Sequence, residues 1–328
     1  MPIRTTVIGS YPKVIASGAD NLPGTLDKWQ RQMVDDRGLE QELQRVTQRV
    51  IREQEQAGLD LVTDGQIRWE DLPHPVARSA PGIQRGALRR FFDNNVYYRR
   101  LELNGGVTWQ KSALAEDFRL AAQWAKKPLK VALPGPLTLV NATEVKPGQT
   151  PEKLLELYEG LLRQEVQALA EAGVKEIQLD EPAFGPGEPL VDQAVAAVNR
   201  IFHGVKARRW VAYYFQDVTA LLPALAKLQV EVLGLDLVSP QEKVEDFLQK
   251  AAARLKEVGW RGEVALGLVD ARNTRLENRE DLKRQIALFA GAIPVSRLWL
   301  SPNCGLEFLP HDRALKKLST LQEAAVSV

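Results

Sequence analysis

Short apolar runs recur along the chain, each ends in a polar or turn residue, and stretches of helical period separate them. The runs predict eight buried strands, at residues 5–8, 61–63, 129–133, 176–179, 210–214, 232–235, 263–268 and 297–300. Between the runs, apolar residues at spacings of three and four predict helices at residues 39–57, 151–172, 219–228, 244–258, 279–290 and 312–325. Alternating strands and helices are typical of a parallel α/β fold, and the number eight favours a closed (β/α)8 TIM barrel.

The alternative for this alternation is an open, doubly wound sheet. Such a sheet usually carries a glycine-rich phosphate loop after its first strand. Here the first strand runs into IGSYPK (8–13), which lacks the G-x-G-x-x-G pattern. We therefore expect residues 1–328 to form a single barrel domain of the α/β class.

One segment, RRFFDNNVYYRR (89–100), breaks the rhythm of strands and helices. Asp and Asn tolerate the left-handed backbone of a tight turn, so the aromatic pairs on either side predict a β-hairpin. The hairpin lies in a long insertion after the second strand, residues 85–110, which in a barrel projects from the C-terminal face. Its side chains either pack with the arginines in solvent or meet an anionic cofactor or partner; they are Arg85, Arg89, Arg90, Phe91, Phe92, Tyr97, Tyr98, Arg99 and Arg100.

The composition excludes several classes of protein. With 43 Lys and Arg against 42 Asp and Glu, the chain has no general attraction to nucleic acid or to a membrane surface. A single cysteine excludes an intrachain disulfide and a multi-cysteine metal site. No apolar run approaches the roughly 20 residues that span a bilayer, and the first residues lack the pattern of a signal peptide. We expect a cytoplasmic protein with neither a membrane nor a nucleic-acid partner.

In a barrel the residues that follow each strand converge on one mouth, and in this sequence they are polar. Those at the strand ends are Ser10, Asp64, Gln66, Asp180, Glu181, Tyr214, Gln216, Asp236, Asp270, Arg272 and Cys304. Carboxylates pair with an ammonium group, while backbone amides and a serine hydroxyl can donate to a carboxylate. The set therefore favours a small, polar, zwitterionic substrate.

Some of these residues have structural roles as alternatives. An acid after a strand is often a helix N-cap, which stays open for Asp236 because Ser239 and Pro240 follow it. A single cysteine is usually a small buried hydrophobe. Cys304, however, stands in a Pro-Asn-Cys-Gly turn, where a functional role is expected. His74, between two prolines in LPHPV, is expected to line the mouth.

The motifs also occur in a familiar order. IGSYP (8–12), TDG (63–65), LPGPLTL (133–139), IQLDEPA (177–183), LGLVDARN (266–273) and LWLSPNCGLE (298–307) together resemble the catalytic barrel of cobalamin-independent methionine synthase, across essentially the whole chain. The resemblance implies homocysteine bound as a thiolate on Zn²⁺. The zinc ligands of that family are a His-x-Cys pair, a glutamate and a cysteine in the last turn, and the metal removes the thiol's proton.

The resemblance assigns roles to individual positions. Cys304 matches the last-turn cysteine, and Asp236 matches the glutamate with a side chain one methylene shorter. The positions that match the family's substrate contacts are Ile8, Gly9, Ser10, Gln66 and Asp180. Asp180 matches the acid that holds the substrate's amine. Gln66 falls near a second amine-binding glutamate and lacks its charge.

The family's His-x-Cys pair falls within WVAYYFQDV (210–218), which contains neither residue. One register puts Ala212 and Tyr214 at the two positions, and a shift of two puts Tyr214 and Gln216 there. Alanine cannot ligate, and tyrosine or glutamine is a poor ligand for soft Zn²⁺. We therefore expect no four-ligand zinc site of the family type.

The one replacement zinc site that the sequence offers combines His74, Asp236 and Cys304. Without a metal, a thiol with a pKa of about 8.5 is mostly protonated at pH 7. A base must then take its proton, and Asp236, Asp180 and Tyr214 are the candidates. The predicted activity is S-methyl transfer to homocysteine or a related small thiol, with Asp236, Tyr214 and Cys304 as catalytic residues.

The methyl donor and two other function classes stay open. Folate-dependent members of the family have a second barrel and this chain has one, so the donor is methylcobalamin, a corrinoid protein as partner, or methylfolate. The first alternative is a metal-free barrel enzyme that acts on a small amino-acid-like substrate. The second is a non-catalytic ligand-binding barrel, which would bind tightly and convert nothing.

Overall fold

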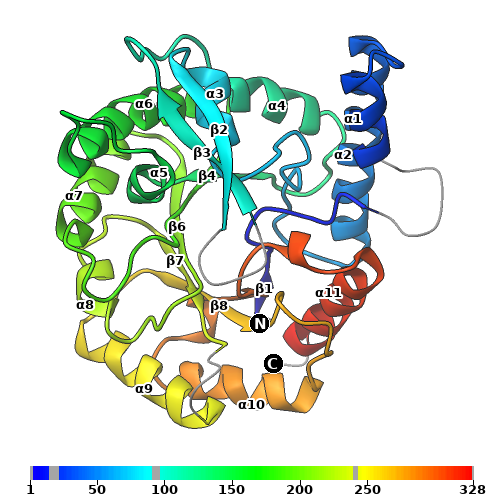
Figure 1. Cartoon of the computed structure of the whole chain (residues 1–328). Coiled ribbons are helices and arrows are strands. Elements are labelled where there is room, and N and C mark those ends of the chain that lie inside the picture. Colours follow the sequence, from blue (N-terminus) through cyan, green and yellow to red (C-terminus); the bar gives the residue numbers. More distant parts are fainter. Residues whose placement is uncertain (1–2, 15–21, 91–96, 239–242, 327–328) are drawn as a thin grey trace.

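The computed structural model describes residues 3–14, 22–90, 97–238 and 243–326. Its main sheet has seven strands in the order β1-β9-β8-β7-β6-β5-β4, and all neighbouring strands are parallel. The strands are β1 (Arg4–Thr5), β4 (Lys130–Pro134), β5 (Glu176–Asp180), β6 (Arg208–Tyr213), β7 (Val232–Asp236), β8 (Glu263–Val269) and β9 (Leu298–Pro302). The sheet is curled and surrounded by a ring of helices (Figure 1), so the chain has the predicted parallel α/β fold in a barrel-like form.

The second predicted strand, residues 61–63, is reduced to single parallel bridges. Leu61 pairs with Thr6, which follows β1, and Val62 pairs with Leu129, which precedes β4. Residues 61 and 62 therefore pair with segments at both edges of the sheet. The strand stops here because Gly65 and Gln66 turn into the left-handed region, with φ of 70° and 53°.

The helices that surround the sheet agree with most of the predicted ones. They are α2 (Asp36–Gln56), α6 (Pro151–Glu171), α9 (Val244–Glu257), α10 (Arg279–Ala290) and α11 (His311–Val326). The helix predicted at 219–228 shrinks to α8 (Leu222–Leu225), since Asp217 accepts bonds from the N–H and hydroxyl of Thr219 and holds a turn there. Elements that were not predicted are α1 (Leu22–Gln30), α3 (His74–Ser79), α4 (Ala113–Ala121), α5 (Pro136–Ala142), α7 (Val191–Ile201), η1 (Val295–Arg297) and η2 (Leu306–Phe308).

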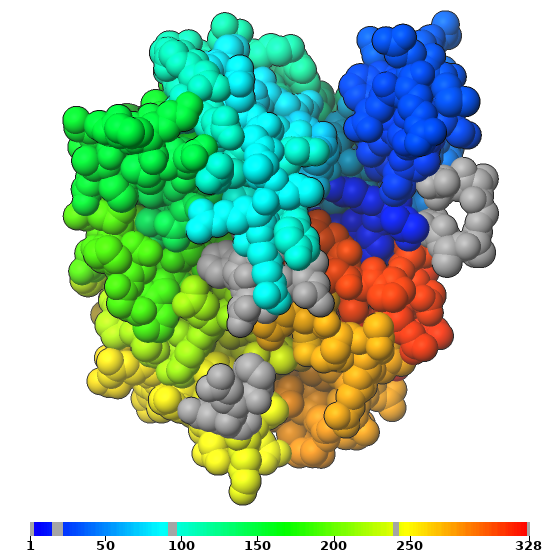
Figure 2. Space-filling model, in the orientation of Figure 1, coloured from blue at the N-terminus to red at the C-terminus, as the bar shows by residue number. Residues whose placement is uncertain are grey.

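A second, two-stranded sheet is formed by β2 (Ile83–Arg90) and β3 (Tyr97–Leu103), which pair antiparallel with Arg90 opposite Tyr97. The predicted turn at residues 93–95 lies outside the described residues. Asp71 anchors the pair, because its Oδ2 accepts a bond of 2.7 Å from the Arg99 N–H. In the space-filling view (Figure 2) the residues of this pair, in cyan, lie on the surface of the face shown, between green residues and the blue N-terminal segment.

The opposite end of the sheet is filled by side chains from the strand starts. Trp210 and Trp299 pack edge to face with ring centroids 5.1 Å apart. The Arg4 guanidinium lies 4.1 Å from the Trp299 ring centroid, and Glu263 accepts a bond of 2.5 Å from the Trp299 indole. This plug of aromatic and paired charged groups leaves the carboxyl ends of the strands as the place for a site. Among the described residues, no helix is both long and apolar enough to cross a membrane.

Candidate functional site

Asp180 ends β5 and lies almost completely buried at the carboxyl end of the sheet. Its Oδ1 accepts a bond of 2.6 Å from Gln178 Nε2, and its Oδ2 lies 3.4 Å from the Tyr214 hydroxyl. Burial raises the pKa of Asp180, and the bonds from Gln178 and Tyr214 together with the Lys130 ammonium oppose this rise. The carboxyl group is therefore held in one orientation, with Oδ2 as its less occupied oxygen.

Lys130 and Gln178 form a buried chain of hydrogen-bonded polar groups with Asp180. Lys130, the first residue of β4, donates to Gln178 Oε1 over 2.6 Å and to the Val7 carbonyl over 2.7 Å. Gln178 in turn donates to the Ile8 carbonyl over 2.9 Å. Desolvation lowers the pKa of Lys130, while the nearby Asp180 raises it in part. Neither Lys130 nor Gln178 was predicted to be a site residue, because both lie within apolar strand patterns.

Tyr214 follows β6, inside the WVAYYFQDV segment where the family's metal ligands would fall. Burial, and then the neighbouring Asp180 and Cys304, raise the pKa of its hydroxyl well above its ordinary value. Its ring packs edge to face on Phe215 at 4.7 Å between centroids. Phe215 has a φ of 80°, in the left-handed region that bulky residues avoid. Such strain persists only where the surrounding structure enforces it, which is typical of functional sites.

Asp236 ends β7 and enforces that strained backbone. Its Oδ2 accepts a bond of 3.0 Å from the Phe215 N–H, and its Oδ1 accepts bonds from the Val238 N–H and from Asn303 Nδ2. Burial raises its pKa, and the Arg272 guanidinium, whose Nη2 lies 3.9 Å from Oδ2, opposes the rise. Asp236 thus holds turn backbone, as its structural alternative requires, and it also lies near Cys304.

Cys304 is completely buried, and its Sγ contacts the Gly305 carbonyl at 3.7 Å. Burial, followed by the nearby Asp236 carboxylate, raises the pKa of its thiol well above the ordinary value. Ser10 lies on the other side of Gly305. A Cβ at Gly305 would stand 1.8 Å from Ser10 Oγ, so only glycine lets the two segments meet. The Ser10 hydroxyl donates to the Glu307 carboxylate.

Gln66 lies against Gly9. A Cβ at Gly9 would stand 2.5 Å from Gln66 Nε2. Gln66 is nearly buried, and its Nε2 has no hydrogen-bond partner among the described residues. The Asp64 carboxylate accepts the Gln66 N–H over 2.9 Å and so holds the turn. Gln66 therefore presents an unused donor beside Gly9, where a glutamate would present a charge.

His74 does not join this cluster. It begins α3, where its Nδ1 accepts a bond of 2.9 Å from the Glu70 N–H. Desolvation, followed by the nearby Arg85, lowers its pKa to about 4. Across the described part of the chain there is no group of three or more His, Cys, Asp or Glu that could hold a metal ion. In the described structure the replacement zinc site on His74, Asp236 and Cys304 is not assembled, and α3 and the Glu70 N–H hold His74.

The donors around Cys304 also fit a family-type zinc poorly. The segment 210–218, in which the resemblance puts the family's His-x-Cys pair, contains neither residue in either register. Glu181, expected beside Asp180, is taken up in the fold. Its two oxygens accept the N–H groups of Leu137 and Thr138, each over 2.9 Å, at the start of α5.

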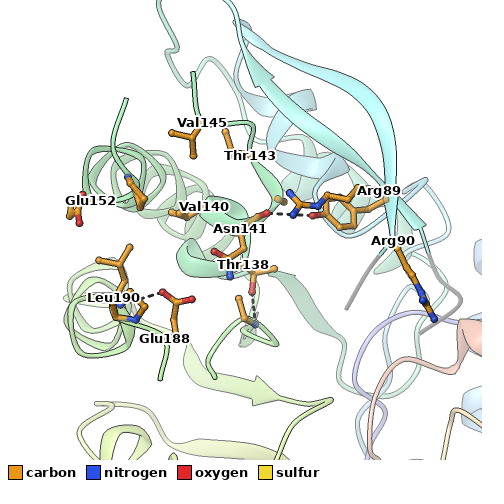
Figure 3. Close-up of a pocket in the computed structure, with 15 residues that line it drawn as sticks. Arg89, Arg90, Thr138, Val140, Asn141, Thr143, Val145, Glu152, Glu188 and Leu190 are labelled. Carbon is orange, nitrogen blue, oxygen red and sulfur yellow. Dashed lines mark hydrogen bonds between the residues drawn. The ribbon is translucent and has the colours of Figure 1, made fainter. Parts of the chain in front are cut away.

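A cavity of about 570 Å³ lies next to α5. Its walls are α5, the start of α6, the segment after β5, and the β2–β3 pair, from which Arg89 and Arg90 extend (Figure 3). Tyr98 donates to the Asn141 carbonyl over 3.4 Å and closes one side. Thr138 lines the cavity and also donates its hydroxyl to Glu181 over 2.7 Å. The Thr138 hydroxyl therefore connects the cavity to Glu181, the neighbour of Asp180 in the sequence, while Asp180, Tyr214 and Cys304 are not among the residues that line it.

Comparisons with known proteins agree on one family. The family model described as the catalytic domain of cobalamin-independent synthase matches residues 3–327. A methionine synthase of Sulfolobus acidocaldarius is 26% identical over 328 residues, which cover 99% of this chain and 92% of that protein. A methionine synthase of Saccharolobus islandicus is 27% identical, over 98% of this chain and 93% of that protein.

Solved structures share the fold. A B12-independent methionine synthase from Shewanella sp. W3-18-1, in complex with selenomethionine, has a TM-score of 0.80 at 20% identity, over 100% of this chain and 97% of that one. The B12-independent methionine synthase described from Listeria monocytogenes has a TM-score of 0.74 at 17% identity, over 98% of each chain. At these identities the likeness establishes the barrel-like fold alone.

Proposed function

The chain belongs to the cobalamin-independent synthase catalytic-domain family, and from this membership we propose that it transfers a methyl group to the sulfur of homocysteine or a related small thiol. The observation that carries the proposal is the meeting of Asp180, Tyr214 and Cys304 at the carboxyl ends of the strands. Curated relatives of similar length are methionine synthases, so one barrel suffices for them. The neighbour from Shewanella binds selenomethionine, a product analogue of the proposed class.

Two residues hold the ends of the substrate in this proposal. The Asp180 carboxylate accepts N–H bonds from the substrate's ammonium group through Oδ2, to which the Tyr214 hydroxyl donates over 3.4 Å. Ser10, with the backbone of Ile8 and Gly9, receives the carboxylate end, and the Ser10 hydroxyl turns to it from Glu307. Gln66 adds a neutral donor beside Gly9, which favours an acceptor group on the ligand at that point.

The thiol then reaches Asp236, Tyr214 and Cys304. Asp236 takes the thiol proton through Oδ2, which accepts one hydrogen bond, from the Phe215 N–H, whereas Oδ1 accepts two. The raised pKa of Asp236 makes it a stronger base than an exposed aspartate. Tyr214 and Cys304 keep their own protons because burial raises both pKa values, so both act as hydrogen-bond donors to the thiolate. The thiolate attacks the methyl carbon, the bond from carbon to the donor breaks, and its electron pair leaves with the donor.

The donor occupies the neighbouring cavity of about 570 Å³ in this proposal. Arg89 and Arg90 offer positive charge to an anionic donor, such as a corrinoid or a folate, at the side of the cavity formed by the β2–β3 pair.

The same proposal includes the fold: the chain forms one domain and one closed eight-stranded barrel. Support for closure comes from the bridges of Leu61 and Val62 to both edges of the sheet.

Elemental analysis tests the degenerate zinc site. We expect protein purified without added metal, both wild type and Cys304→Ser, to contain no stoichiometric zinc, since residues 210–218, where the family's His-x-Cys pair is expected, contain neither residue. One equivalent of zinc in the wild type that disappears in Cys304→Ser would contradict the metal-free mechanism. It would leave the proposed methyl transfer intact and return its activation step to a metal ion.

A second candidate function is a binding protein without turnover. The observation in its favour is the same lack of His and Cys in residues 210–218. Such a protein would bind a methionine-like ligand at Ser10 and Asp180. It would release the ligand unchanged after prolonged incubation with any methyl donor, which separates it from the enzyme.

A further inference from the structure

We propose that Lys130 is a positioning residue, whose buried ammonium fixes the amide of Gln178 and, through that amide, the carboxylate of Asp180. The inference rests on the proposed function, because Asp180 is the residue assigned to the substrate's amine. It goes further by naming a residue outside the strand-end mouth that sets how this carboxylate meets a ligand.

The groups around Lys130 stabilise its positive charge inside the barrel-like sheet. The side chain is 1% exposed, and its Nζ bonds to the Val7 carbonyl and to Gln178 Oε1. The same nitrogen lies 4.5 Å from the ring centroid of Trp210, in the geometry of a cation–π contact. A buried ammonium without partners is costly, so these three contacts explain how the charge is tolerated.

The ammonium decides which way the Gln178 amide faces. A lysine offers only donors, so Gln178 must present its oxygen to Nζ. Its nitrogen then donates to the Ile8 carbonyl over 2.9 Å and to Asp180 Oδ1 over 2.6 Å. The reversed amide would set N–H against the ammonium and oxygen against both the Ile8 carbonyl and the Asp180 carboxylate. Only one orientation is therefore compatible with a charged Lys130.

The fixed amide sets the geometry of Asp180. Oδ1 is occupied by the short bond from Gln178, which leaves Oδ2 on the side of Tyr214. If Lys130 is removed, the amide can rotate and Oδ1 loses its donor. The carboxyl group then has no single orientation, and a ligand ammonium must pay the cost of ordering it.

Calorimetric titration with L-methionine tests the inference. We expect Lys130→Met and Gln178→Met each to weaken binding by about tenfold or more, the effect of a bond to a charged group. Adding Lys130→Met to Asp180→Asn should weaken binding little beyond Asp180→Asn alone, because both changes act on one interaction. Lys317→Met is the matched control. This second fully buried lysine bonds to Arg275 and Glu277, and its loss should lower thermal stability but leave the affinity unchanged.

Each result of these experiments supports or overturns the positioning role of Lys130. Folded Lys130→Met and Gln178→Met proteins that bind L-methionine as the wild type does would overturn the inference and leave the proposed function standing. If Lys130→Met does not fold, Gln178→Met alone decides, because it keeps the ammonium and removes the link. If the wild type does not bind L-methionine, the proposed function fails, and carboxyl-carbon NMR of Asp180 decides the inference. A changed titration of Asp180 in Gln178→Met supports the link, and an unchanged one overturns it.

Discussion

At the scale of single residues, the site depends on groups whose roles overlap. Asp236 holds turn backbone and also lies near Cys304, so its structural role is seen while its catalytic role stays a prediction. The turn that it holds includes the left-handed Phe215, whose N–H donates to Asp236. The pattern of apolar residues in 210–214 predicts a strand and carries no sign of the strained residue that follows.

His74 gives the molecule a specific response to acid. Its folded pKa of about 4 lies below the ordinary value near 6.5, because burial disfavours the charged ring and Nδ1 must stay unprotonated to accept the Glu70 N–H. Below pH 6.5 the unfolded chain therefore binds a proton that the folded protein refuses. The stability that His74 contributes is complete above pH 6.5 and is lost as pH falls toward 4.

We expect His74→Asn to reduce this sensitivity, because an asparagine oxygen can replace Nδ1 as the acceptor. Between pH 7 and pH 5 the wild type should lose on the order of 1–2 kcal/mol more unfolding free energy than the variant. Urea denaturation at the two pH values measures the difference. His203→Asn, a change at an exposed histidine, serves as the control and should follow the wild type. Equal pH slopes for wild type and His74→Asn would contradict the assigned cause.

At the scale of elements, buried carboxylates tie helices to one another. Glu165 on α6 is 5% exposed and accepts from the Trp109 indole, the Ser112 hydroxyl and the Leu114 N–H. Ser112 is itself the N-cap of α4, so one carboxylate fixes the start of the neighbouring helix. The sequence placed Glu165 within a helix, but its partners come from a segment more than 50 residues earlier.

Replacing Glu165 by alanine should lower the unfolding free energy by about 2–4 kcal/mol, because three buried donors lose their acceptor. Glu171→Ala provides a matched control on the same helix. Glu171 is exposed and accepts only from Gln167 in the described structure, so its loss should cost about 0.5 kcal/mol or less. Urea denaturation compares the two variants, and similar losses in both would show that Glu165 is not a helix anchor.

The order of elements was predictable where the apolar period was long or the strand was deeply buried. The predicted helix at 151–172 and the predicted strand at 232–235 correspond to α6 and β7 within one residue. The helix α7 was readable from its apolar spacing and was missed. The segment 61–63 was expected as a full strand, but the left-handed turn at Gly65 and Gln66 leaves it only two bridges.

At the scale of the whole molecule, the parallel sheet explains how distant segments form one site. Ser10, Asp180 and Cys304 were predicted to converge because the carboxyl ends of parallel strands share one face. The close approach of Ser10 to Gly305, the bond of Tyr214 to Asp180 and the electrostatic effect of Cys304 on Tyr214 agree with that geometry. What the sequence could not predict is the support from inside the sheet. In the sequence Lys130 and Gln178 are isolated polar residues within apolar strands, and only the pairing of β4 with β5 brings them together.

The measurement that tests the central claim most directly is the formation of L-methionine from L-homocysteine by the purified protein, with methylcobalamin or methylfolate as donor. The account predicts that one of the two donors supports turnover without added zinc, and that Asp180→Asn lowers kcat/KM by about tenfold or more through loss of a bond to a charged group. The absence of methionine with both donors, with or without zinc, would contradict the claim, as would equal rates for the wild type and Asp180→Asn.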